Sequence, residues 1–353
     1  MVKRASILSV GILCLLLFLS CKRETDIDTA DSSTGDSPEV TIADSGETHL
    51  LRDDLKPLDT VMMIEAVGDS ALIVVDAQPS VGYFANHVMT RTYGRIGRGP
   101  CEYLEISNID TNSDSLFVLD SAQAKIIAYN LNTAECLGET SHPILQRAHY
   151  LERLDGSYLT GRIYYRVGTP DSTVLLKLVH DNGTVEDLSL TKGEVNPVPV
   201  RFPFDLQGIN FARYGNRIYA AFPLSGMLAK LDLETHKIST YSMDLVLNRK
   251  AFEEATSDSG DAGDLINGGM VEIVRGVFAA KNWVGVSTIR FHREEPNIEK
   301  FHVFTPERKL IRSLNYQDNP SIIRGNELLI IDATGPAESR YGYQVTYRQI
   351  SVY

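Results

Sequence analysis

The sequence predicts an all-β fold, a six-bladed β-propeller built from four-stranded antiparallel blades. Three observations carry this prediction: a strand-like unit recurs roughly every 44 residues, short apolar runs alternate with Gly, Asp and Asn turns, and helical periodicity appears only in patches. Four-stranded sheets that are apolar on both faces pack radially into a propeller, which leaves only short, protected edges. A β-sandwich or a solenoid is the rival, but a sandwich has no reason to repeat at this period.

The repeat is clearest in runs that end in aspartate. The runs 69–76 and 114–120 each combine a turn residue, an apolar stretch and a terminal Asp, and the two terminal aspartates lie 44 residues apart. A third such run covers 326–332, and weaker copies begin at Gly156, Gly215 and Lys281. Second strand-like segments follow most of these runs, as at 125–129, 174–179, 227–231 and 299–304.

The terminal aspartates Asp76, Asp120 and Asp332 occupy equivalent positions in the repeat. We expect each carboxylate to cap a turn by accepting backbone N–H bonds. The alternative is a ring of carboxylates that binds a metal at the axis. Such a ring would be incomplete, because Gly161, Ala221 and Ser287 stand at about the corresponding places in the other runs.

Blade number and ring closure follow from the length of the expected domain, residues 48–353. At this period the domain would hold nearly seven blades, but two long connections, 191–213 and 244–276, reduce the number to six, with seven as the alternative. We expect an N-terminal segment, either 38–42 or 60–66, to complete the last blade, which contains 341–347. Closure of this kind would hide both end edges of the ring.

The N-terminus predicts export and lipid attachment. Lys3 and Arg4 precede an apolar stretch at 5–19, which has the length of a signal peptide and falls short of a membrane span. Residues 1–20 are therefore expected to be removed. The stretch ends in Ser20-Cys21, which resembles the bacterial lipobox and implies an acylated Cys21; an unmodified Cys21 beside a plain cleavage site is the alternative. We expect residues 21–47 to be a flexible tether to the outer membrane, on its periplasmic face or at the cell surface.

Charge and motif content narrow the function. The chain has a formal net charge of −12, which argues against nucleic-acid binding, because that binding depends on clustered Lys and Arg. The patterns HExxH, GxSxG and CxxC and paired His ligands do not occur, so we expect no cofactor, no metal site and no catalytic residue. The acidic stretch 258–264 lacks EF-hand spacing and is expected to be a flexible loop.

Two cysteines, Cys101 and Cys136, remain in the expected mature domain. An even pair in an oxidising envelope can form a disulfide. A domain of this size does not need a covalent staple, however, and connectivity cannot be deduced from sequence. We expect two separate, half-buried thiols and keep the disulfide as the alternative.

The segment Tyr93-Gly-Arg-Ile-Gly-Arg-Gly-Pro-Cys-Glu-Tyr103, followed by the strands expected at 116–120 and 125–129, resembles the six-bladed TolB-like or NHL-like propeller lipoproteins of Bacteroidetes. Their pattern at this place is a glycine-rich stretch that ends in Gly-Pro-Gly-Glu-aromatic, and Cys101 stands where that pattern has its third Gly. The resemblance implies the propeller fold and a location in the cell envelope.

The same segment supplies the candidate ligand-binding residues Arg95, Arg98, Glu102 and Tyr103. Guanidinium groups on a loop of an acidic protein suit an anionic partner, such as an envelope protein or an acidic glycan. The alternative is a structural turn in which Arg95 or Arg98 pairs with Glu102 or Glu105. The order GxxGxG at 94–99 and its place between strands argue against a nucleotide loop.

Three functional hypotheses remain. The leading one is a lipid-anchored, non-catalytic envelope propeller that binds a ligand or a protein. The second is an axial-metal, lactonase-like hydrolase or lyase that acts on a lactone or a glycan. The third is a structural partner in an outer-membrane complex. Three or more carboxylate or amide side chains that converge on the axis would favour the enzyme, whereas an apolar or arginine-lined channel would favour binding.

Overall fold

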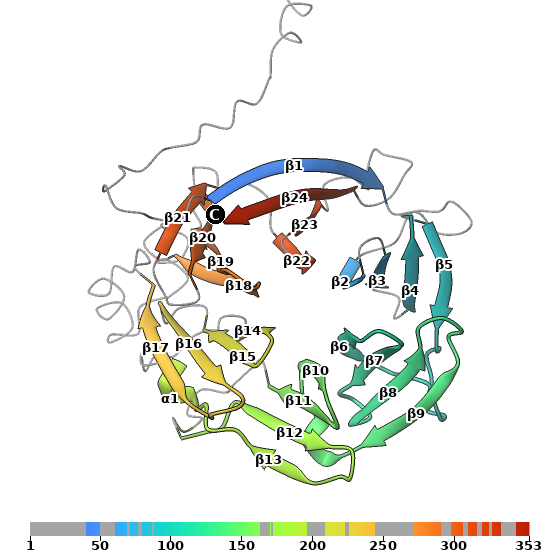
Figure 1. Cartoon of the computed structure of the whole chain (residues 1–353). Helices are drawn as coiled ribbons and strands as arrows, with labels where there is room; N and C mark the ends of the chain where they lie inside the picture. The colour runs from blue at the N-terminus through green and yellow to red at the C-terminus, as the bar shows by residue number, and fades with distance from the viewer. Residues whose placement is uncertain are drawn as a thin grey trace, which may run out of the picture. The chain divides into compact units, whose positions relative to one another are not determined.

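Six sheets of four antiparallel strands make up the described part of the chain (Figure 1). The structure is a computed structural model, and it describes residues 40–49, 61–68, 71–76, 80–86, 88–162, 170, 172–195, 209–222, 226–243, 272–290, 298–305, 310–315, 320–324, 327–332 and 344–352. The six four-stranded blades predicted from the sequence are confirmed. The lipidation candidate Cys21 and the acidic stretch 258–264 lie outside these residues. No helix in the described residues has the length and apolarity needed to cross a membrane.

The strands of each blade are given in order from the innermost strand to the outermost. Blade 1 contains β2 (Val61–Val67), β3 (Ala71–Asp76), β4 (Ser80–Ala85) and β5 (Val88–Tyr93). Blade 2 contains β6 (Ile106–Thr111), β7 (Ser115–Asp120), β8 (Lys125–Asn130) and β9 (Cys136–Ser141). Blade 3 contains β10 (Tyr150–Leu154), β11 (Ser157–Gly161), β12 (Leu176–His180) and β13 (Val185–Asp187).

Blade 4 contains β14 (Asn210–Tyr214), β15 (Arg217–Ala221), β16 (Met227–Asp232) and β17 (Ile238–Ser242). Blade 5 contains β18 (Ile273–Ala279), β19 (Val284–Arg290), β20 (Ile298–Phe304) and β21 (Leu310–Asn315). Blade 6 contains β22 (Pro320–Arg324), β23 (Glu327–Asp332), β24 (Gln344–Val352) and β1 (Val40–His49). A 3-10 turn, η1 (Pro143–Leu145), and a short helix, α1 (Lys192–Val195), lie in connections between strands.

Blade 6 joins the two ends of the propeller. Its outermost strand β1 pairs antiparallel with β24, so that Val40 lies opposite Val352 and Ile42 opposite Ile350. The expectation that segment 38–42 closes the ring is confirmed for the residues described. The alternative segment, 60–66, is wrong, because residues 61–67 form the innermost strand of blade 1. The expected end of the tether at residue 47 is also too late, since β1 already begins at Val40.

The hydrophobic cores lie between neighbouring blades. Along β7, Leu116 and Val118 pack with Ile73 of blade 1, whereas Phe117 and Leu119 pack with the side chains of blade 3. Both faces of this strand are therefore buried, which explains why its sequence is a continuous apolar run. Each large apolar side chain buried in this way stabilises the fold by about 1.5–3 kcal/mol.

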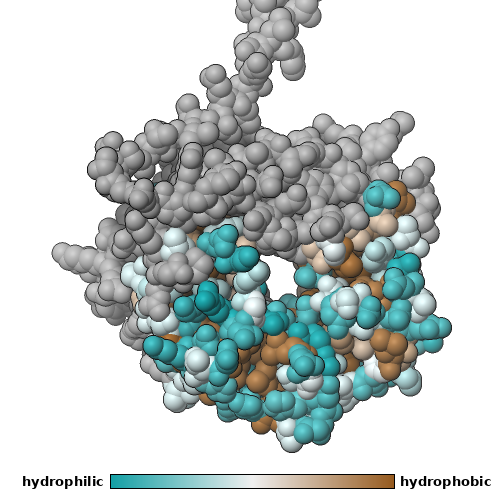
Figure 2. Space-filling view, viewed as in Figure 1, coloured by the Kyte–Doolittle hydropathy of each residue, from teal (hydrophilic) through white to brown (hydrophobic). Residues whose placement is uncertain are grey.

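The six innermost strands surround the centre in Figure 1, and neighbouring ones touch: β2 contacts β6 and β22, β6 contacts β10, and β18 contacts β14 and β22. Blades 3 and 4 share a core that includes Leu159 and Ile218. The innermost strands therefore place their side chains both at the blade interfaces and next to the axis. Figure 2 shows an opening in the middle of the face drawn, bordered in part by described residues.

Candidate functional site

The glycine-rich segment 94–105 connects the outermost strand of blade 1 to the innermost strand of blade 2, and we call it the crossover loop. Three backbone hydrogen bonds fold it back on itself. The N–H of Gly97 donates to Tyr103 O at 3.0 Å, that of Tyr103 to Arg95 O at 3.1 Å, and that of Glu102 to Gly99 O at 3.2 Å. The loop therefore has a defined conformation.

The Glu102 carboxylate lies inside this fold. It accepts hydrogen bonds from the Gly99 N–H at 2.7 Å and from the Arg95 Nε at 2.5 Å, and these two donors lower the pKa of Glu102 below its usual value. A Cβ atom at Gly97 would lie 2.0 Å from the Glu102 carboxylate. A side chain at this position would therefore displace the Glu102 carboxylate from its hydrogen bonds.

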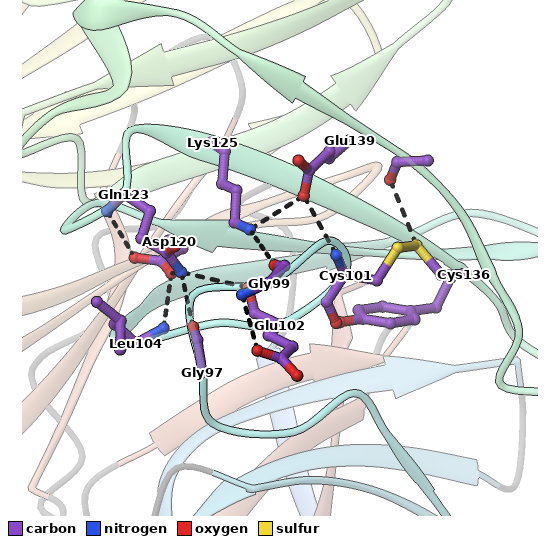
Figure 3. Close-up of polar contacts among 12 residues, drawn as sticks. Gly97, Gly99, Cys101, Glu102, Leu104, Asp120, Gln123, Lys125, Cys136 and Glu139 are labelled. Carbon is purple, nitrogen blue, oxygen red and sulfur yellow. Dashed lines mark hydrogen bonds and ion pairs between the residues drawn. A yellow bond between two sulfur atoms is a disulfide. The ribbon is translucent and has the colours of Figure 1, made fainter.

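Side chains of blade 2 contact the loop and hold it in place (Figure 3). Gln123 Nε2 donates to Gly97 O at 3.1 Å and to Glu102 O at 3.2 Å. Lys125 is 4% exposed, and its ammonium group donates to Gly99 O at 3.3 Å and to the Glu139 carboxylate at 3.0 Å. These contacts fix the carbonyl groups of the loop, so its conformation does not depend on a ligand.

Asp120 also holds the loop. Its carboxylate accepts hydrogen bonds from the Leu104 N–H at 2.7 Å and from the Gln123 N–H at 3.0 Å. The expected turn-capping role is therefore confirmed for Asp120. Asp76 is buried at the end of β3, and the side chain of Asp332 lies outside the described part of the chain.

A disulfide between Cys101 and Cys136 ties the crossover loop to β9, the outermost strand of blade 2, with a Cα–Cα distance of 6.1 Å. The expectation of two separate thiols is wrong. The fold of the loop is the reason: Cys101 has a φ of +60°, a left-handed conformation that directs it toward β9, and Tyr129 OH donates to its carbonyl at 2.8 Å. This conformation also fits the glycine that the related lipoprotein pattern has at this place.

Replacing both cysteines, in Cys101→Ser with Cys136→Ser, should destabilise the protein by about 3–4 kcal/mol, because the bridge closes a loop with a sequence separation of 35 residues. Urea unfolding of the oxidised wild type and of the double variant measures the difference. Reduction of the wild type should produce the same loss. A wild type whose unfolding midpoint does not respond to reductant would contradict the disulfide.

The structure places the four candidate ligand-binding residues on two sides of the loop. The Arg95 side chain is 81% exposed, Arg98 is exposed, and Ile96 between them is 57% exposed. Glu102 points inward, and its pairing with Arg95 is the structural alternative stated above. Tyr103 is only 1% exposed, so it is not a ligand-binding residue but a support: its OH donates to Tyr93 O at 3.0 Å.

A second polar group, which the sequence reasoning missed, lies on the innermost strands. Glu65 of β2, Asp110 of β6 and Glu152 of β10 occupy equivalent positions in blades 1, 2 and 3, opposite Ile73, Phe117 and Leu159. We call these three residues the carboxyl row. Their signal in the sequence is an apolar-acidic dipeptide that recurs in each first strand, at 64–65, 109–110 and 151–152.

Each member of the carboxyl row has a different set of partners. Glu152 accepts hydrogen bonds from Tyr150 OH at 2.6 Å and from Arg213 Nη1 of blade 4 at 2.7 Å. Asp110 accepts a hydrogen bond from the backbone N–H of Arg153 in blade 3. The three carboxyls lie on strands next to the axis, but no group of three His, Cys, Asp or Glu among the described residues is arranged to hold a metal ion.

The comparisons agree with this architecture. A family model described as a 6-bladed beta-propeller matches residues 86–254. Among solved structures, an exported protein from Bacteroides fragilis is similar at 16% identity and a TM-score of 0.61, over 88% of this chain and 95% of that chain. A streptogramin B lyase is similar at 9% identity and a TM-score of 0.47, over 88% of this chain and 98% of that one. No curated protein matches the sequence.

The chain is thus an all-β protein of the propeller class, with four-stranded antiparallel blades. The family model and the Bacteroides fragilis structure support a family of six-bladed β-propellers for it. At 16% identity, the likeness to that structure concerns the fold alone.

Proposed function

We propose that this chain is a lipid-anchored protein of the cell envelope that binds a carboxylate-bearing partner at the crossover loop and catalyses no reaction on it. The carrying observation is the preformed loop, which presents two guanidinium groups to solvent on a disulfide-bonded frame. Arginine suits planar, two-pronged recognition of carboxylates, and a preformed loop loses little conformational entropy on binding.

The exposed arginines of this loop support an anionic partner. In a chain of formal net charge −12, Arg95 and Arg98 are two exposed cations, and the 57% exposed Ile96 adds apolar contact area between them. Glu102, which pairs with Arg95, and the exposed Glu105 balance their charge within the loop, so recognition would depend on guanidinium geometry rather than on net charge. Within residues 94–105, all of which are described, Cys101 is held in the disulfide and Glu102 in an ion pair. This arrangement favours binding over chemistry at the loop.

The proposed location is the outer membrane, with acylated Cys21 as the anchor and either the periplasmic face or the cell surface as the side exposed. The basic n-region, the short apolar stretch and the Ser20-Cys21 junction support this proposal. A Bacteroides fragilis protein of similar fold is described as exported, which is consistent with export of this chain. We also propose that the chain belongs with the TolB-like or NHL-like lipoproteins of Bacteroidetes, because the sequence of the crossover loop resembles theirs.

Replacing both arginines, in Arg95→Ala with Arg98→Ala, should weaken partner binding by about 5- to 150-fold, the equivalent of about 1–3 kcal/mol for hydrogen bonds to charged groups. Binding is measured by calorimetry with two probes, a polyglutamate peptide and a polygalacturonate oligosaccharide, which distinguish a protein partner from an acidic glycan. Because the Arg95 side chain is 81% exposed, the free energy of unfolding should fall by less than about 1 kcal/mol.

The matched control is Arg217→Ala with Lys281→Ala, which removes the same charge from two exposed positions on blades 4 and 5. It should leave the affinity unchanged. If the loop variant melts far below the wild type while its folded fraction binds normally, the two arginines are structural and the proposed site is wrong. Equal weakening in both double variants would mean that only net charge matters.

A further inference from the structure

The carboxyl row crosses three successive blade interfaces. The side chains of β10 alternate: Leu151 packs in the core toward blade 2, whereas Tyr150 and Leu154 pack in the core toward blade 4. Glu152 shares the face of Tyr150, and by its equivalent position each member of the row faces the next blade. Glu65 therefore lies at the interface of blades 1 and 2, Asp110 at that of blades 2 and 3, and Glu152 at that of blades 3 and 4.

Cations compensate this row incompletely. Arg213 contacts Glu152 at 2.7 Å. Arg153 follows Glu152 in the chain, but its guanidinium points away from the row. It pairs with Asp181 at 2.5 Å and lies 4.4 Å from the centre of the Tyr158 ring. Only the backbone N–H of Arg153 donates to Asp110. Within the described residues, the structure gives Glu65 no hydrogen bond or ion pair. Full ionisation would thus put three negative charges against one neighbouring cation.

Burial and mutual repulsion raise the pKa values of the row, whose three side chains are partly buried. Burial, with the Glu152 charge adding to it, raises the pKa of Asp110 to about 7. Burial also raises the pKa of Glu65 well above its usual value, and the Asp110 and Glu152 charges raise it further. The pKa of Glu152 is raised by burial although Arg213 lowers it. The Tyr150 phenol also lies close enough to Asp110 for the two groups to interact electrostatically.

We propose that the carboxyl row is a proton-operated switch that holds blades 1 to 3 tightly around the axis when Glu65 and Asp110 are protonated and loosens them when these two ionise. Ionised Glu152 keeps its contact with Arg213 and so ties blade 3 to blade 4. A protonated carboxyl needs no counter-charge at a blade interface, whereas an ionised one repels the carboxylates on the neighbouring innermost strands. The switch acts on the inner wall of the ring, because β2, β6 and β10 are the innermost strands.

The direction of the effect follows from linkage. A carboxyl whose folded-state pKa is raised contributes stability that is complete below its unfolded pKa and is lost as the pH rises through the folded value. For Asp110 this window runs from the usual value near 4 to about 7. The protein should therefore be more stable at mildly acidic pH than at mildly alkaline pH.

Thermal unfolding of the mature chain between pH 5.5 and pH 8 tests the switch. We expect the wild-type midpoint to fall by on the order of 5 °C across this range. Asp110→Asn, an uncharged mimic of the protonated form that keeps an acceptor for the Arg153 N–H, should reduce this fall by about half and melt above the wild type at pH 8. The control Asp114→Asn removes one exposed carboxylate of the same blade and should keep the wild-type slope.

A second variant and a second measurement keep the test decisive if Asp110→Asn does not fold. Glu65→Gln should flatten the same curve, and amide hydrogen exchange of the wild type, corrected for the intrinsic pH effect, should show β2, β6 and β10 opening more at pH 8 than at pH 6. A wild-type midpoint that is constant across the range, or variants that keep its full slope, would overturn the proposal.

Discussion

Cys21→Ala should release the protein from membranes completely. The proposed anchor is the set of acyl chains on this residue, and each buried CH2 of such a chain contributes about 0.8 kcal/mol to membrane binding. The apolar stretch 5–19 is shorter than the roughly 20 residues that a spanning helix needs, so it cannot replace the lipid. Fractionation of cells that express the full chain, with radiolabelled palmitate as a second readout, measures the effect.

Cys14→Ala provides the matched control, because Cys14 lies in the segment expected to be removed. That variant should remain in the membrane fraction and keep its label. If Cys21→Ala is processed at the signal and still stays with the membrane at the wild-type level, the lipoprotein proposal fails. The binding proposal for the crossover loop would survive that outcome, since it depends on residues of the propeller alone.

The runs that end at Asp76, Asp120 and Asp332 became β3, β7 and β23, the second strands of their blades. In β3 and β7 the side chains of both faces are buried. A strand that packs between two neighbouring blades has a continuous apolar sequence, and such apolar runs are recognisable in the sequence. The repeat period and the length of the domain, less the two long connections, then predicted six blades.

The innermost strands were harder to predict for the same physical reason. In β6 only Ser107 and Ile109 are buried, because the strand lies beside the axis and its sequence mixes polar and apolar residues. The carboxyl row lies on strands of this type, so the search for apolar runs passed over it. An alignment of the first strands of the repeats would have brought Glu65, Asp110 and Glu152 into one column.

Contacts between distant segments were equally out of reach. The disulfide depends on the left-handed conformation of Cys101 and on the position of β9, and neither can be deduced from the spacing of the two cysteines. The sequence predicts Tyr103 as a ligand-binding residue of the glycine-rich segment, but the loop turns it inward, where its OH donates to the carbonyl of Tyr93. In a loop that folds back on itself, residues that are adjacent in the sequence can point in opposite directions, one to solvent and one to the core.

The second large effect is expected when the strand that closes the ring is removed. Deleting the chain through His49 removes β1 and leaves β24 as the outer edge of blade 6. β24 spans Gln344–Val352, and its hydrogen-bonding groups would then face solvent along its whole length. An open edge of this kind recruits strands from other chains, so the truncated protein should aggregate and lose its cooperative melting transition. Size-exclusion chromatography and calorimetry measure both losses.

A shorter deletion serves as the control, because it shortens the chain but keeps the strand that closes the ring. Removing residues 22–35 takes away acidic and hydroxyl side chains but leaves β1 intact, so the melting temperature should stay within about 1 °C of the wild type. Supplying residues 38–50 as a synthetic peptide to the chain that begins at residue 50 should restore solubility, because the peptide can occupy the vacant place beside β24. A chain that begins at residue 50 and melts cooperatively without the peptide would show that blade 6 does not need β1.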